Sequence, residues 1–395
     1  MPGVWVHIVR AMTPNISQEE LNYRPGMEGV PACRSSIGFV DGTNGILEYR
    51  GYGIVDLCKN STFEEVTFLL LNGKLPSAGE LSEFDQTLRA HRKITEVSKN
   101  IIKALPKDGH PMSMLQVIIA ALGMQDQYSD LKNQSRNLNA IINIIAKMPT
   151  YITFFERLRK GLDPIEPDPS LNHSANFIYM LTGKKPTELE TKIFDVCLIL
   201  HAEHTLNAST FSARVTASTL TNPYTALSAA VGTLYGPLHG GANESVLQML
   251  DQIGSVKNVR TFVENKLSKK EKIMGVGHRV YKTKDPRAIA LQDLAAQLFA
   301  GTQEDELLEV AKELEKVVKE KLAAKGIYPN VDFYSGLVYR KLGFSTDMFT
   351  PIFAAARSSG WAAHWIEQMA DNKLFRPTQV YTGQHEVPYT PVAQR

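Results

Sequence analysis

Four of the ten histidines fall within residues 201–278, in contexts that bear on chemistry. His201 and His204 stand three residues apart, so on a helix they would share a face. A metal site would need one or two further ligands, and this spacing differs from the HExxH pattern of zinc proteases, so zinc is disfavoured. For any single histidine, a hydrogen-bonded structural role is the starting interpretation.

A denser pattern surrounds His239 in residues 236–243, GPLHGGAN. Glycines let a ligand or another backbone approach closely, and Asn243 could cap a helix expected over 244–250. A histidine at a helix start tends to stay neutral, because the positive end of the helix dipole disfavours the imidazolium form. A neutral imidazole can donate a hydrogen bond to a developing enolate oxygen. An ordinary helix entry explains the same residues equally well.

A basic cluster follows in residues 274–287, MGVGHRVYKTKDPR. Gly275 and Gly277 fall short of a dinucleotide-binding fingerprint, because the third glycine and the βαβ context are missing. They can still bring backbone amides against a flat ligand group. Three basic side chains of the cluster suit an anionic ligand: His278, Lys282 and Arg287. Asp285 could instead simply pair with a neighbouring arginine or lysine.

One carboxylate, Asp332, stands in an aromatic context, PNVDFYSG. Desolvation there would raise its pKa toward the range of a general base, although it could also cap a helix that begins near Ser335. Arg357 lies in a run of small residues typical of a packed helix, and Arg376 follows about five helical turns later. Two or three guanidinium groups at one pocket would fit a small dicarboxylate, since each can bind a carboxylate in bidentate fashion.

The elements that must position these residues are mostly helices. Residues 35–52 hold the one strand-like region, in which two apolar runs flank the turn sequence DGTNG, as in a β-hairpin. A capping-box pattern begins at Thr62, and Gly73 is placed to end that helix. Apolar spacing predicts helices over 66–71, 80–93, 112–124, 136–148, 187–206 and 302–325. In the last of these, Glu315 and Lys319 are expected to form an i,i+4 ion pair.

Length and composition bound the remaining possibilities. The 395 residues suggest two or three domains, and 43% hydrophobic with 21% charged residues excludes a disordered chain. The net charge of +2 argues against a nucleic-acid binder. The three cysteines form no CxxC pair, which favours a reducing compartment. Neither a signal peptide nor a stretch of about 18 uninterrupted apolar residues is evident, so we expect a soluble, cytoplasmic protein without a membrane partner.

Taken together and in order, seven motifs resemble the citrate synthase family. They are HAEH (201–204), GPLHG (236–240), GVGH (275–278), DPR (285–287), NVD (330–332), Arg357 and Arg376-Pro377. The resemblance, which extends from about residue 25 to 385, implies a mainly α, two-domain fold. A large helical domain with an N-terminal arm and a short β-hairpin would comprise residues 1–236 and 337–395, and a smaller helical domain would comprise residues 237–336.

The resemblance also implies an activity. The enzyme would be an acyltransferase that condenses acetyl-CoA with oxaloacetate and hydrolyses the citryl thioester, the entry step of the tricarboxylic acid cycle. It would use no metal and no cofactor, since acetyl-CoA is a substrate. Asp332 would remove a proton from the acetyl methyl group, His239 would hydrogen-bond the enolate oxygen, and His278 would polarise the ketone of oxaloacetate.

Substrate-binding residues follow from the same resemblance. Oxaloacetate would be bound by His204, Arg287, Arg357 and Arg376. CoA would contact Gly275, Val276, Gly277 and Lys282. Because Arg376 would come from the neighbouring subunit, a homodimer or a larger homo-oligomer is expected.

Three alternatives stay open at this point. A 2-methylcitrate synthase would share every motif and use propionyl-CoA, and one methylene in an apolar pocket discriminates by only about 1–3 kcal/mol. A metallohydrolase would use His201, His204 and Asp332 around zinc. A helical scaffold without activity is the third alternative. Residues 1–20 match no family pattern, and we expect them to form an arm that supports an oligomer.

Overall fold

The computed structural model describes residues 22–126, 130–277, 280–300 and 306–395. The chain divides into two compact units. One is Ser35–Leu374, and the other joins the end segments 1–34 and 375–395. The described parts of the end segments contain two short 3-10 helices, η1 (Pro25–Met27) and η5 (Val392–Gln394). The expected arm over residues 1–20 lies outside the described residues.

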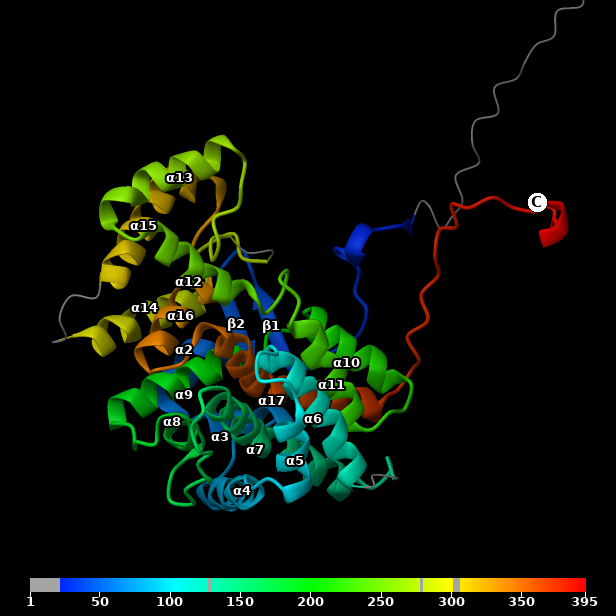
Figure 1. The fold of residues 1–395 in the computed structure, drawn as a ribbon, viewed down its shortest axis with the longest axis horizontal. Coiled ribbons are helices and arrows are strands. Elements are labelled where there is room, and N and C mark those ends of the chain that lie inside the picture. Colours follow the sequence, from blue (N-terminus) through cyan, green and yellow to red (C-terminus); the bar gives the residue numbers. More distant parts are fainter. Residues whose placement is uncertain (1–21, 127–129, 278–279, 301–305) are drawn as a thin grey trace, which may run out of the picture. The chain divides into compact units, whose positions relative to one another are not determined.

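The unit Ser35–Leu374 is built almost entirely of helices (Figure 1). Their bounds within the described residues are α2 (Ile54–Asn60), α3 (Phe63–Asn72), α4 (Ala78–His91), α5 (Glu96–Ala104), α6 (Pro111–Asp126), α7 (Gln134–Arg159), α8 (His173–Thr182), α9 (Glu188–Ala202), α10 (Ala208–Ser218), α11 (Pro223–Leu234), α12 (Ala242–Ile253), η2 (Val256–Asn258), α13 (Val259–Ser268), α14 (Pro286–Phe299), α15 (Glu306–Leu322), η3 (Ala323–Lys325), α16 (Val331–Lys341), η4 (Thr346–Met348) and α17 (Phe349–Ala370). The predicted mainly α class is confirmed.

Helix α17 is the central element of this unit, and α3, α7, α9, α10 and α11 pack around it (Figure 1). Its sequence is apolar or small on every side, which is typical of a helix that is buried all round. Residues 349–365 of α17 are buried without interruption. A polar or charged side chain on this helix, such as Arg357, is therefore held inside the protein.

Helices α12 to α16 pack on one another, and this part of the chain contains Arg287 on α14, Asp332 on α16 and, in the loop before α14, Gly275, Val276, Gly277 and Lys282. Contacts link α14 with α16, α12 with α16 and α13 with α15 (Figure 1). The predicted boundaries of the smaller domain, at residues 237 and 336, stay a prediction.

The predicted hairpin is part of a three-stranded antiparallel sheet. Strands β1 (Gly38–Asp41), β2 (Ile46–Tyr49) and β3 (Tyr52–Gly53) pair in chain order. The Asp41 carboxylate accepts hydrogen bonds from the backbone of Thr43 and Asn44, at 2.9 and 3.0 Å, and so closes the turn. These bonds lower the pKa of Asp41. Strand β3 was not predicted, because two residues are too short to show an alternating pattern.

The turn of this hairpin packs directly against the loop that precedes α14. The Lys282 backbone N–H donates to the Gly42 carbonyl at 2.8 Å. A Cβ atom added at Gly42 would lie 2.1 Å from the Val280 carbonyl oxygen, so no side chain fits there. The glycine allows the two backbones to approach this closely.

Helix α3 begins and ends as predicted. The Thr62 hydroxyl accepts from the Glu65 backbone N–H at 3.2 Å, and Gly73 adopts a left-handed conformation at φ 77° after the last turn. The reciprocal half of the capping box is not formed. The Glu65 carboxylate instead accepts a hydrogen bond from the Ser61 hydroxyl at 2.5 Å.

Helix α7 is much longer than the predicted range of 136–148, because it continues through Pro149 to Arg159. By length and composition alone, α7 could cross a membrane. However, 83% of its most apolar stretch is buried inside the described fold, as expected of a core helix.

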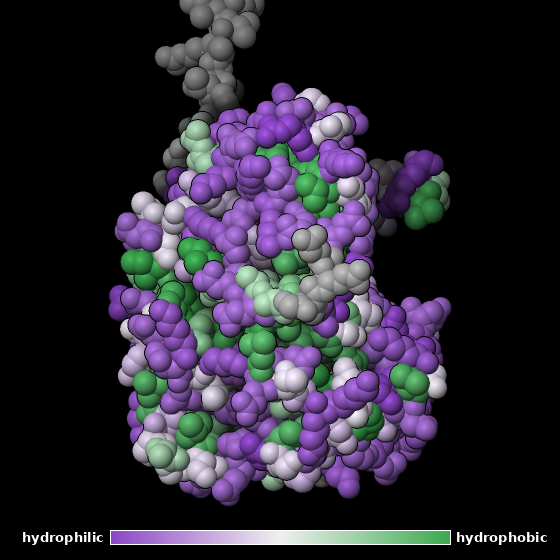
Figure 2. Space-filling model, turned by 90° about the vertical axis from the view of Figure 1, so that its left-hand side faces the viewer, coloured by the Kyte–Doolittle hydropathy of each residue, from purple (hydrophilic) through white to green (hydrophobic). Residues whose placement is uncertain are grey.

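Helix α15 differs from the prediction in one contact. It is described from Glu306, whereas the predicted start at residues 302–305 lies outside the described residues. The predicted Glu315–Lys319 pair is wrong. Glu315 turns away from its own helix and pairs with Lys284, whose Nζ lies 2.6 Å from its Oε1. Lys312, Lys316 and Lys319 are exposed, and the part of the surface where α13 and α15 lie is mainly hydrophilic (Figure 2).

Candidate active site

Asp332 lies in the first turn of α16. The Asn330 side chain caps this helix by accepting from the Asp332 backbone N–H at 3.0 Å, so the alternative role of Asp332 as the cap is wrong. Burial raises the pKa of the Asp332 carboxyl to about 6, and the positive charges of Arg287 and Arg357 oppose that rise. The group is therefore a carboxylate at neutral pH, and it is a stronger base than an exposed aspartate.

Arg287 is held by a buried ion pair at the start of α14. Both oxygens of Asp285 accept from its guanidinium, Oδ1 from Nε at 3.0 Å and Oδ2 from Nη2 at 2.8 Å. Asp285 also caps α14 by accepting from the Arg287 backbone N–H at 2.9 Å. The alternative that Asp285 pairs with a neighbouring arginine is thus confirmed. The pair orients the guanidinium and leaves its Nη1 group outside the bidentate contact.

Arg357 is the second buried arginine. Its Nε donates to the His201 carbonyl at 2.6 Å, and its guanidinium lies 4.8 Å from the centre of the Phe353 ring. That carbonyl belongs to the last turn of α9, where backbone acceptors lack partners within the helix. Burial lowers the pKa of Arg357 to about 10, so it remains a cation at neutral pH.

His201 and His204 do not share a helix face, so this prediction is wrong. Helix α9 ends at Ala202, and Glu203 is extended at φ −147° and ψ 150°. His201 is fully buried with its Nδ1 at 2.7 Å from the Cys197 carbonyl, and burial lowers its pKa to about 3. It is a neutral structural histidine. His204 lies beyond the helix, with its Nε2 at 3.2 Å from the Tyr281 hydroxyl.

His239 contacts the start of a helix, but of a different helix from the expected one. The Ser209 backbone N–H, in the first turn of α10, donates to His239 Nε2 at 3.2 Å. The Ser209 hydroxyl also lies 2.8 Å from Nε2. Because a backbone N–H can only donate, we take Nε2 as the acceptor and assign the ring proton of the neutral form to Nδ1. Burial, aided by the Arg357 charge, lowers the pKa of His239 to about 4, so the ring is neutral. Asn243 is not the cap of α12, since Gly241 occupies that position.

The glycine strip 275–277 is bonded to the segment that leads into α16. The Gly277 N–H donates to the Tyr328 backbone carbonyl at 2.8 Å, and the Asn330 N–H donates to the Gly275 carbonyl at 3.0 Å. Both glycines have positive φ, 71° and 90°. A Cβ atom at Gly275 would lie 2.6 Å from Val246 Cγ2. Hence these glycines have a structural reason to be glycine, whatever else they bind.

The other three predicted residues are His278, Arg376 and Lys282. His278 lies outside the described residues. Arg376 belongs to the unit of end segments, where it is exposed and its Nη1 donates to the Pro377 carbonyl at 2.9 Å. The Lys282 side chain is exposed, although its backbone is fixed on the hairpin turn.

The described residues offer no metal-binding set. No group of three or more His, Cys, Asp or Glu side chains among them is arranged to hold a metal ion. His201, His204 and Asp332 are all described, and they do not form such a group. The metallohydrolase alternative therefore lacks the ligand geometry that it requires.

Comparison with known proteins decides the family. The family model described as "Citrate synthase, C-terminal domain" matches residues 26–378. A citrate synthase of Synechocystis is 56% identical over 373 residues, which is 94% of this chain and 94% of that protein. A citrate synthase of Acidithiobacillus ferridurans is 52% identical over 383 residues, 95% of this chain and 99% of that protein. The chain belongs to the citrate synthase family.

A solved citrate synthase supports the fold as well. The structure from the archaeon Thermoplasma acidophilum, a ternary complex with carboxymethyl coenzyme A and oxaloacetate, gives a TM-score of 0.89 at 33% identity. The match covers 94% of this chain and 99% of that one. The predicted family, fold class and enzyme class are confirmed. These three relatives are all named citrate synthase, which supports the main predicted function over the propionyl-CoA alternative.

Sequence reasoning missed several residues that organise this citrate synthase site. Ser209, Tyr281 and Phe353 each contact a site histidine or arginine. Glu203 is fully buried next to His204, with its Oε1 at 3.2 Å from His364 Nε2. Glu203 lies inside the HAEH motif, Tyr281 lies inside the basic cluster 274–287, and Phe353 stands four residues before Arg357 on α17. Ser209 had no such signal, because its contact with His239 joins positions 30 residues apart.

Proposed function

We propose that this chain condenses acetyl-CoA with oxaloacetate and hydrolyses the resulting citryl thioester, with the residues above dividing the steps. One observation carries the assignment of roles. A carboxylate of raised pKa, Asp332, and a neutral imidazole, His239, both lie within the field of the same buried cation, Arg357. A base and a hydrogen-bond donor at one cationic site are what enolisation of a thioester requires.

The first proposed step is enolisation. The methyl group of an acetyl thioester is a weak carbon acid, so its proton leaves only if the enolate oxygen is stabilised as charge develops. Asp332 takes the proton. His239 donates its Nδ1–H to the enolate oxygen, and the Ser209 N–H keeps the ring in the tautomer that makes this possible.

The second step is attack of the enolate carbon on the ketone of oxaloacetate, followed by hydrolysis of the thioester by water. Oxaloacetate is a dianion, and guanidinium groups are suited to hold its carboxylates. We assign its binding to His204, Arg287, Arg357 and Arg376. We assign polarisation of the ketone to His278. We assign the contacts with CoA to Gly275, Val276, Gly277 and Lys282. No metal or further cofactor takes part in this mechanism.

An assay of thiol release tests the proposal directly. We expect rapid CoA release from acetyl-CoA that depends on oxaloacetate, and a lower kcat/KM for propionyl-CoA. Absence of oxaloacetate-dependent release would overturn the proposed reaction. A higher kcat/KM for propionyl-CoA would instead assign the chain to 2-methylcitrate synthesis, because the two substrates differ by one methylene in an apolar pocket.

The pH dependence of the reaction should report Asp332. Because the carboxylate form is the base and its pKa is raised to about 6, kcat/KM for acetyl-CoA should fall as the pH drops through about 6. Below that point the decline approaches tenfold per pH unit, since protonation removes the base. We would measure kcat/KM from pH 4.5 to 8.5 at saturating oxaloacetate. An acid limb with its midpoint below pH 4.5 would contradict the raised pKa.

We further propose a cytoplasmic homo-oligomer of at least two subunits. The free thiols of Cys58 and Cys197, both buried, support a reducing compartment. The exposed Arg376 supports a shared site, because an exposed arginine is available to a neighbouring subunit. Light scattering that gives the mass of one chain would contradict the proposed oligomer. Recovery of the protein outside the cytoplasm would contradict the proposed location.

A further inference from the structure

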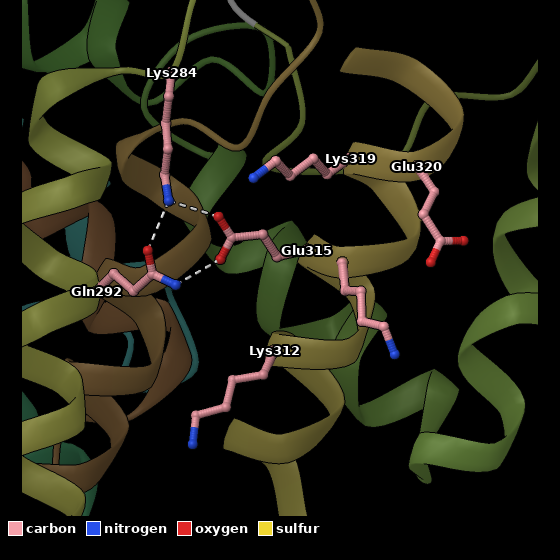
Figure 3. A pocket seen from close by; sticks show the side chains of 7 residues that line it. Lys284, Gln292, Lys312, Glu315, Lys319 and Glu320 are labelled. Carbon is pink, nitrogen blue, oxygen red and sulfur yellow. Dashed lines mark hydrogen bonds and ion pairs between the residues drawn. The ribbon is translucent and has the colours of Figure 1, made fainter. Parts of the chain in front are cut away.

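Glu315, a carboxylate that the proposed mechanism does not use, lies on α15 and faces α14 and α16. Its side chain is 14% exposed and forms part of the wall of a surface hollow of about 590 Å³. Figure 3 shows it projecting from α15 toward Lys284 and Gln292, and the side chains of Lys312 and Lys319 extend from α15 toward the same side. The hollow is lined by Lys284, Gln292, Lys312, Glu315, Lys316, Lys319 and Glu320.

Three donors from three segments converge on this one carboxylate. Lys284 Nζ donates to Oε1 at 2.6 Å, and Gln292 Nε2 donates to Oε2 at 2.9 Å (Figure 3). The Tyr334 hydroxyl also donates to Oε2. Lys284 Nζ further donates to Gln292 Oε1 at 2.7 Å, which closes a ring of hydrogen bonds. Charge-assisted bonds of this kind are stronger than neutral ones and fix geometry.

Two of these donors adjoin residues to which we assign chemistry. Lys284 immediately precedes Asp285, the residue that caps α14 and orients Arg287. Tyr334 follows Asp332 by two positions on α16, so at 100° per residue the two side chains leave the helix in nearly opposite directions. Glu315 therefore holds α16 from behind while it also holds the segment that carries the arginine.

We propose that Glu315 is a positioning residue that sets the placement of the base Asp332 relative to the substrate-binding Arg287. This inference rests on the roles given to those two residues above. Glu315 itself contacts no substrate. It acts through Tyr334 on one side and Lys284 on the other, and both connections depend on its negative charge and its two acceptor oxygens.

Other acidic residues on α15 show what an ordinary surface pair looks like. Glu313 pairs with Lys316 at 3.2 Å, and Glu309 pairs with Lys312 at 2.7 Å, each three residues along the same helix, and both glutamates are more exposed than Glu315, at 26% and 45%. Such pairs contribute little and connect nothing beyond their own helix. Glu313 is thus a matched control that lies two residues away from Glu315.

The test compares Glu315→Gln with Glu313→Gln in the full-length enzyme. We expect Glu315→Gln to lower kcat about tenfold while KM for oxaloacetate changes less than threefold, since small displacements of a base cost rate more than binding. Glu313→Gln should match the wild type in both constants. A purely structural role would lower thermal stability and leave kcat per folded molecule unchanged, and that result would overturn the proposal.

A second variant keeps the proposal falsifiable if Glu315→Gln does not fold. Tyr334→Phe removes only the hydroxyl donor, and we expect it to lower kcat with little change in KM. The double variant should lose little more kcat than Glu315→Gln alone, because both changes break one connection. Fully additive losses, or wild-type kcat in Tyr334→Phe, would refute the connection through α16. If the wild type is active and Asp332→Asn is inactive, either of those two results would refute only the role of Glu315 and leave the proposed reaction standing. An inactive wild type would overturn both proposals.

Discussion

Replacing Asp332 with Asn should lower kcat by at least about 100-fold while oxaloacetate still binds. Asn has nearly the same shape but cannot accept a proton from the acetyl methyl group, so the loss falls on the chemical step. Arg287 and Arg357 are untouched by the change, and the bonds that orient them come from Asp285 and the His201 carbonyl. Binding of the dianion should therefore survive.

The measurement pairs steady-state kinetics with calorimetric titration of oxaloacetate. Asp251→Asn is a suitable control. Asp251, on α12, pairs at 2.7 Å with Arg340, which lies on α16 like Asp332, and both side chains of this pair are exposed. That variant should keep wild-type kcat. Full activity of Asp332→Asn would mean that another group is the base, whatever family the chain belongs to.

Removing the His239 side chain should cost nearly as much. In His239→Ala the proposed donor to the enolate oxygen is lost, and loss of one such donor typically lowers kcat by about 10²–10³-fold. The neutral state of the ring, with its pKa lowered to about 4, implies that this loss is the same at pH 6.5 and pH 8.5. A donor that was an imidazolium ion would instead lose its contribution at the higher pH.

Kinetics of His239→Ala at those two pH values test the role and the protonation state together. His91→Ala serves as the control, since His91 bonds only the Thr87 carbonyl of its own helix at 2.8 Å among the hydrogen bonds described for its ring. A His239→Ala enzyme within fivefold of wild-type kcat would exclude His239 as the enolate donor.

Much of the fold could be predicted from local signals. The hairpin, the start and end of α3 and the helical class all follow from patterns within about ten residues. The predicted helix end and the predicted ion pair were wrong where a contact with a distant segment outweighed the local preference. The helix predicted over 136–148 ends just before Pro149, yet α7 continues through that proline inside the core. Glu315 was expected to pair along its helix, yet Lys284 supplies a less exposed partner from another segment.

The site divides in the same way. Residue types and family motifs pointed to Asp332, His239 and the arginines, because their chemistry is distinctive. What fixes their protonation and orientation was not predictable, since Ser209 reaches His239 from 30 residues away and Arg357 reaches the end of α9 from 156 residues away. His201 shows the converse, because a motif residue proved to be a buried structural group.

The contact between Gly42 and Val280 has a consequence for how freely this region can change in sequence. The hairpin turn meets the loop through backbone atoms, with the Lys282 N–H on the Gly42 carbonyl. An exposed side chain of the loop such as Lys282 can therefore be exchanged without losing the backbone support beneath it, whereas position 42 admits only glycine in this arrangement. The CoA contact that we propose for Lys282 is thus open to adjustment by mutation, while the scaffold that carries it is not.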